Sequence, residues 1–238
     1  MALYRDQGVV LRTIKLGETD RIVTILGQGH GKVRAVAKGV RKPGSRFGAR
    51  LEPTVHLAFQ CYRGRELDVV TQVETIDANR GLREHYGCLT HAISMLEAVD
   101  QVAPEREPNP SVYRMLVGAL RTLAATPSPV VSTAFFWKLL SLEGLHPVVD
   151  GCVHCGADDE LVAFDPREGG ALCSGCARLG GRLVDDRTLE TLSRILGGDV
   201  RGVLAEPPEP LVLAELERLA LDALEGHLER HLRSAALL

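Results

Sequence analysis

The sequence predicts an α+β protein in which a five-stranded barrel over residues 1–80 is followed by an all-helical domain over residues 81–238. Three observations lead to this prediction. Short runs of alternating apolar residues fill the first third, apolar residues recur at helical spacing in the remainder, and a four-cysteine pattern at about residues 150–182 indicates a ribbon embedded among the helices. A chain of 238 residues is long enough for two small domains.

Five runs of strand length lie in the first third, and no helical pattern separates them. They are rich in β-branched residues, are bounded by glycine and charged turns, and cover residues 7–14, 21–26, 32–38, 54–62 and 67–75. This pattern indicates a small closed or nearly closed barrel, of which the OB-fold is a common nucleic-acid-binding example. An SH3-like barrel or a small sandwich predicts much the same pattern, and the number of strands does not separate the three.

The stretch Arg21–Arg50 contains no Asp or Glu, although the whole chain has a net charge of −3. Residues 1–80 carry 14 Lys and Arg against 8 Asp and Glu, so the remainder of the chain is acidic. A local excess of cations in an acidic chain is typical of a surface that binds a polyanion, most often a nucleic acid.

Alternation along the third strand predicts that its basic side chains share the outer face, opposite Val33, Ala35 and Ala37. The following Gly/Pro/Ser loop extends the charge, and flexible cations suit phosphate contacts that do not depend on base sequence. The candidate DNA-binding residues are Lys32, Arg34, Lys38, Arg41, Lys42, Arg46 and Arg50. Phe47 in this loop is interpreted as an anchor on the barrel rather than as a residue that stacks on a base.

Apolar residues recur at helical spacing from Leu82 onward. Helices are expected at residues 82–102, 112–125, 130–143, 189–196 and 211–232. The third of these is apolar nearly all round, which predicts a central position. His227 and His231 lie four residues apart, but no metal-binding motif of a known type surrounds them.

The pattern Cys152-x2-Cys155 recurs after seventeen residues as Cys173-x2-Cys176. Two such pairs place four sulfurs around one point, and tetrahedral Zn²⁺ accepts four thiolates. A site closed by four thiolates has no open position, so we expect one structural Zn²⁺ per chain. Cys61 and Cys88 are expected to be buried as small apolar residues.

No catalytic motif is recognisable: the sequence contains no phosphate-binding loop, dinucleotide-binding glycine pattern, nucleophile elbow or HExxH motif. We therefore expect a non-enzymatic protein without a small-molecule substrate. There is no N-terminal apolar segment with a cleavage site, and the longest uncharged stretch, Thr122–Trp137, is too short to span a bilayer. A cytoplasmic location without membrane contact is expected.

Three motifs together resemble the RecO family of bacterial DNA-repair and recombination mediators. They are YRDQGVVLRTIKLGETDRIVTIL at residues 4–26, GKVRAVAKGVRKPGSRFGARLEP at residues 31–53, and LLSLEGLHP before CVHCG at the first cysteine pair. The resemblance implies an N-terminal OB domain that binds single- and double-stranded DNA, strand annealing, and a nucleoid-associated location. It also implies action with RecR, with the single-stranded-DNA-binding protein SSB, and in many lineages with RecF, to load RecA recombinase. Some members lack the cysteines, whereas all four are present here.

The charges and the cysteines also allow two other functions. One is an RNA-binding or translation-associated protein with an OB barrel and a zinc ribbon. The other is a protein-interaction adaptor whose helical part does the binding and whose basic loop is incidental.

Overall fold

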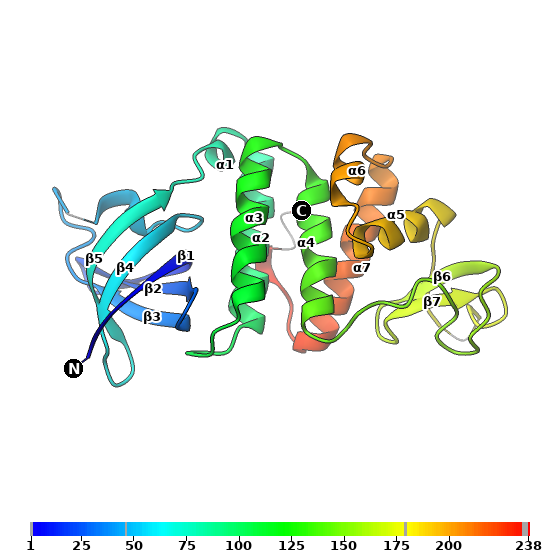
Figure 1. The fold of residues 1–238 in the computed structure, drawn as a ribbon, viewed down its shortest axis with the longest axis horizontal. Coiled ribbons are helices and arrows are strands. Elements are labelled where there is room, and N and C mark those ends of the chain that lie inside the picture. The colour runs from blue at the N-terminus through cyan, green and yellow to red at the C-terminus, as the bar shows by residue number, and fades with distance from the viewer. Residues whose placement is uncertain (1, 46, 179, 235–237) are drawn as a thin grey trace. The chain divides into compact units, whose positions relative to one another are not determined.

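The structure is a computed structural model that describes residues 2–45, 47–178, 180–234 and 238. The backbone forms two compact units, residues 1–127 and 128–237. The first unit holds the barrel together with the first three helices, and the second holds the remaining helices and the cysteine ribbon (Figure 1). Strands give way to helices near residue 80, whereas the first compact unit continues to residue 127. None of the helices in the described residues is long and apolar enough to cross a membrane.

The predicted barrel is confirmed as a closed, OB-like barrel with the strand order β1-β2-β3-β5-β4. Its strands are β1 (Leu3–Leu16), β2 (Asp20–Gly27), β3 (Gly31–Ala37), β4 (His56–Tyr62) and β5 (Asp68–Asp77). β1 is longer than the sequence predicts because it pairs with β4 along its first half and with β2 along its second half. A register shift between Val10 and Arg12 bends the strand between these two partners.

The barrel closes through a short parallel contact between β3 and β5, which pair at only two positions, Ala35 and Val36 of β3. The beginning of β3 is covered instead by the connection between two helices, where Glu105 bridges Lys32. Gly31 makes this approach possible, because a Cβ atom there would lie 2.2 Å from the carbonyl oxygen of Glu107. Gly31 also has a φ of +66°, a conformation that other residues rarely adopt.

The helices of the first unit are α1 (Gly81–Glu84), α2 (Tyr86–Val102) and α3 (Pro110–Ala125), and α2 and α3 run side by side (Figure 1). A single helix was expected over residues 82–102, but His85 has an extended backbone conformation and separates α1 from α2. Tyr113 of α3 contacts the barrel through its hydroxyl group, which lies 2.8 Å from Nε2 of His56.

The second unit is built around α4 (Pro129–Leu142), which packs against α7 (Pro210–Leu228). The central position that the sequence predicts for α4 is confirmed, since eight consecutive residues from Val130 to Trp137 are buried. Trp137 is fully buried, donates from Nε1 to the carbonyl oxygen of Leu216 at 3.1 Å, and packs edge-on against Phe164 of the ribbon.

The ribbon contains a small sheet in the order β7-β6-β8, formed by β6 (Leu161–Asp165), β7 (Gly170–Cys173) and β8 (Arg182–Leu183). Two further helices, α5 (Asp186–Leu196) and α6 (Val200–Ala205), follow it, and the sequence did not predict the short α6. α7 ends at Leu228 rather than near residue 232, because Glu229 takes the left-handed conformation with a φ of +51°.

Candidate nucleic-acid interface and candidate metal centre

The four predicted cysteine ligands come together at one point of the ribbon. All four sulfur atoms lie within 4.8 Å of one another. The first pair lies in a turn in which the Gly156 amide donates to the Cys152 carbonyl at 2.8 Å, and Gly156 takes a φ of +77°. In the second pair, the Cys176 amide donates to the Cys173 carbonyl at 3.1 Å. These two tight turns present both thiol pairs to a common centre.

Electrostatics favours a bound cation at this centre. Backbone N–H groups, first among them that of Cys173, lower the pKa of Cys152 to about 6. Hydrogen bonding to the Cys152 sulfur, in contrast, raises the pKa of Cys176 to about 12. Four thiolates at this separation repel one another. A divalent cation offsets this repulsion, and thiols that coordinate a metal are deprotonated. The donor set therefore has the geometry and the chemistry to bind a metal ion.

His227 and His231 do not lie on one helix in the structure. His231 lies beyond the end of α7, and its Nδ1 is 2.7 Å from the Glu225 carboxylate. The cysteine cluster is the one group of potential metal ligands found among the described residues. Outside it, Cys61 and Cys88 are buried, as the sequence predicts.

The connection between β3 and β4 carries the predicted basic loop. Lys38, Arg41 and Lys42 are exposed, and Arg50 is exposed in the short 3-10 helix η1 (Gly48–Leu51). The Arg41 guanidinium donates to the carbonyl oxygen of Glu18 at 3.0 Å, which holds the loop beside the turn between β1 and β2. Arg46 is the remaining candidate in this loop, and it lies outside the described residues.

Phe47 anchors the loop on the barrel and is only 2% exposed. It belongs to the barrel core together with Leu51 and Leu57, so the interpretation of Phe47 as an anchor is confirmed. Arg21 is also engaged within the barrel, because its guanidinium forms an ion pair with Glu52 at 2.6 Å. The loop that carries these cations is therefore anchored on the barrel.

Lys32 and Arg34 have partners within the first unit. The Lys32 ammonium donates to the carbonyl oxygen of Asp100 at 2.5 Å and lies 3.5 Å from its carboxylate, and the lysine side chain is only 13% exposed. Arg12 binds the same carboxylate at 2.5 Å. Arg34 lies 3.4 Å from Glu105. These contacts join the barrel to α2 and to the segment after it, so the seven candidates fall into two groups with different surroundings.

We expect the replacement Lys32→Met to lower the free energy of unfolding by about 2 kcal/mol, because it leaves a nearly buried carboxylate with a single cationic partner. The affinity for a duplex oligonucleotide should change little at temperatures at which the variant stays folded. Urea denaturation and fluorescence anisotropy measure the two quantities.

The matched control is Lys38→Met, which removes an exposed charge just beyond the same strand. This variant should keep the denaturation midpoint of the parent and lose oligonucleotide affinity. The reverse pattern in the two variants would contradict the division of the basic residues into two groups.

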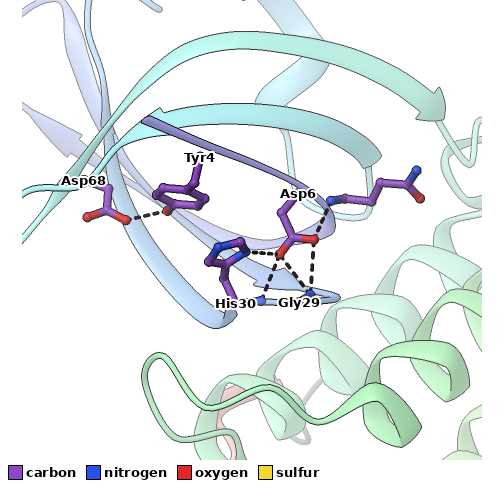
Figure 2. A network of polar contacts seen from close by, with 6 residues as sticks. Tyr4, Asp6, Gly29, His30 and Asp68 are labelled. Carbon is purple, nitrogen blue, oxygen red and sulfur yellow. Dashed lines mark hydrogen bonds and ion pairs between the residues drawn. The ribbon is translucent and has the colours of Figure 1, made fainter. Parts of the chain in front are cut away.

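The carboxylates near the start of β1 are satisfied within the fold (Figure 2). Asp6 accepts hydrogen bonds from the backbone N–H groups of Gln7, Gly29 and His30, and its Oδ2 also lies 3.0 Å from Nδ1 of His30. The fully buried Asp68 accepts a hydrogen bond from the Tyr4 hydroxyl at 2.5 Å. Burial and this hydrogen bond raise the pKa of Tyr4. Both acids therefore have nearby donors that offset their charge.

Three further cations lie near this end of the barrel, and they are not among the candidates predicted from the sequence. Arg63 and Arg65 are exposed in the hairpin between β4 and β5, and Arg5 is exposed on β1. In the sequence Tyr62-Arg63-Gly64-Arg65 an aromatic residue stands beside two cations, a local pattern that could have indicated nucleic-acid binding. The position of Arg5 next to this hairpin follows only from the pairing of β1 with β4.

Taken together, the chain has a closed five-stranded barrel with a basic loop, a helical region and a four-cysteine centre. Comparison with protein families matches residues 1–79 to "Recombination protein O N terminal" and residues 83–236 to "Recombination protein O C terminal". The chain is also 42% identical to the DNA repair protein RecO of Nocardioides sp. strain JS614, over 98% of each chain. The chain belongs to the recombination protein O family.

Proposed function

We propose that this chain is a cytoplasmic, non-catalytic mediator of recombination in DNA repair, which binds single- and double-stranded DNA and promotes the annealing of complementary strands. The observation that carries the proposal is the exposed, acid-free loop with Lys38, Arg41 and Lys42 on a closed barrel, in a chain of this family. Arg46 and Arg50 are further candidate DNA contacts in the proposal, whereas Lys32 and Arg34 contribute mainly to stability. Contacts from such a loop go to phosphates, so binding is tolerant of sequence and sensitive to salt.

The partners in the proposal are those that the family resemblance implies. The mediator acts with RecR, and in many lineages with RecF, to place RecA recombinase on DNA that is coated by the single-stranded-DNA-binding protein SSB. In the ribbon, Cys152, Cys155, Cys173 and Cys176 hold one Zn²⁺, which is structural because four thiolates leave no coordination position for a substrate.

A strand-annealing assay tests the proposal. The purified protein should accelerate the pairing of two complementary labelled oligonucleotides several-fold over the spontaneous rate, and should still do so when both strands are coated by the cognate single-strand-binding protein. The rise of fluorescence energy transfer between the labels measures the rate. A rate equal to the spontaneous one under both conditions would contradict annealing. A clear preference for RNA in competition with DNA of equal sequence would favour an RNA-binding role instead.

A further inference from the structure

The outer face of β1, β4 and β5 carries an exposed apolar row with one aromatic residue, Tyr62, near the start of β1. The strand register places Leu3 of β1 beside Tyr62 of β4, and Tyr62 beside Val69 of β5. Leu3 is 48% exposed and Tyr62 is 43% exposed. An exposed tyrosine flanked by apolar side chains presents a flat surface to solvent, and the barrel core on the other side of the sheet does not need it.

The next row of the same face is polar and is held in place by hydrogen bonds. Arg5 of β1 donates from Nε to the amide oxygen of Gln60 at 2.7 Å, and the Gln60 amide nitrogen donates to the Thr71 hydroxyl at 3.1 Å. Gln60 pairs in register with both Arg5 and Gln72. Amide groups that neighbours orient in this way offer donors and acceptors at fixed positions.

A groove of about 910 Å³ begins at this polar row and extends toward the connection between β3 and β4. Its lining includes Arg5, Gln60, Gln72, Glu74, Phe47 and Arg50. Arg5 enters the groove from β1, and Arg50 enters it from η1. The groove therefore runs from the polar row next to Tyr62 to Phe47 and Arg50, at the end of the basic loop.

The charge around the groove favours an anionic ligand. Arg63 and Arg65 lie in the hairpin that follows Tyr62, together with Glu66. The carboxylate of Asp6, at the edge of the groove, is already bound by backbone N–H groups and by His30 (Figure 2). Glu74 in the groove and Glu66 in the hairpin are the remaining acids of this set, which also contains four arginines, Arg5, Arg50, Arg63 and Arg65.

We infer that this face binds the bases of a single-stranded nucleic acid, with Tyr62 stacking on a base and with the Gln60 amide contacting base edges. The inference rests on the proposed function and adds to it a second surface, where bases are contacted rather than phosphates alone. Aromatic stacking next to cations is the usual way in which sequence-tolerant proteins hold single strands, because every base has a π-face. Bases of a duplex are stacked and paired, so this face selects single strands.

The test compares Tyr62→Ala with Tyr62→Phe in the full-length protein, with an oligothymidine and a duplex of equal length as probes. The alanine variant should bind the oligothymidine roughly 5- to 100-fold more weakly, which is the usual effect of removing one stacking partner. The phenylalanine variant should bind it like the parent, because the ring is kept. Duplex affinity should be the same for all three proteins.

Tyr86→Ala is the matched control, because Tyr86 is a 79% exposed tyrosine at the start of α2. This variant should keep the single-strand affinity of the parent. A second measurement locates the contact directly. After photocrosslinking to an oligonucleotide that contains 5-iododeoxyuridine, the label should appear on the tryptic peptide of residues 51–63, which includes Tyr62.

The outcomes separate the inference from the proposed function. If the parent binds both probes and Tyr62→Ala binds the oligothymidine as tightly as the parent, the inference is wrong and the proposed function stands. Equal losses on single strands and duplex in Tyr62→Ala would also overturn the inference, because a base contact does not affect a duplex. If the parent binds neither probe at low salt, the proposed function itself fails.

Discussion

The combined replacement of Lys38, Arg41 and Lys42 by glutamate is expected to weaken binding to a duplex oligonucleotide at low salt by roughly two orders of magnitude or more. All three side chains are exposed in the connection that Phe47 anchors, so their removal costs the fold little. Each phosphate contact releases condensed counterions, and a loss of three contacts should reduce the slope of log affinity against log salt by about 3. Fluorescence anisotropy titrations at several salt concentrations measure both quantities.

The control replaces three other exposed arginines, Arg114, Arg201 and Arg230, by glutamate. The change in net charge is the same, but these residues lie outside the basic loop. This protein should keep most of the affinity and nearly the same slope as the parent. An equal loss of affinity in both triple variants would show that net charge, rather than the loop, governs binding.

Loss of metal from the ribbon is expected to have the largest effect on stability. Within the described residues, the cluster around the cysteines buries only Cys152, Ala163 and Leu172, and one of these three is itself a candidate ligand, whereas Phe164 packs instead against Trp137. So small a core does not stabilise a fold without a crosslink. Structural zinc in small domains contributes on the order of 10 kcal/mol of apparent binding free energy, so Cys173→Ser should unfold the ribbon.

Metal analysis and thermal melts followed by circular dichroism test this expectation. The parent should contain about one equivalent of zinc, and a value below about half an equivalent would contradict a four-thiolate site. Cys88→Ser is the control, because it removes a thiol outside the cluster and should leave the zinc content unchanged. The effect of Cys173→Ser on the melting temperature should be larger than its effect on the affinity for DNA. Equal loss of affinity at temperatures at which the variant is folded would indicate that the ribbon contacts DNA.

The sequence was most informative where local chemistry decides the structure. Alternation predicted all five barrel strands, and paired spacing predicted the cysteine cluster, because both patterns act over a few residues. The anchoring of Phe47 was predictable because an aromatic residue in a short polar loop gains most by burial.

Long-range pairing limited the prediction of the site. Lys32 and Arg34 look like other outward cations of a basic strand, and their partners Asp100 and Glu105 lie about seventy residues further along the chain. The neighbourhood of Arg5 and Gln60 likewise depends on the register between the first and fourth strands. No local pattern encodes either relation, because each arises only when distant segments pack together.

The contact of Gly31 with the backbone of Glu107 has a consequence for how the barrel avoids self-association. β3 pairs with β5 at only two positions, so the beginning of β3 would be an open edge with unpaired amides and carbonyls. The backbone at Glu105 and Arg106 covers that edge, and the Arg106 amide donates to the Lys32 carbonyl at 3.0 Å. A fragment that ends near residue 80 lacks this cover, and we expect its open strand edge to favour intermolecular sheet growth. The segment between α2 and α3 thus covers the edge at which such growth would begin.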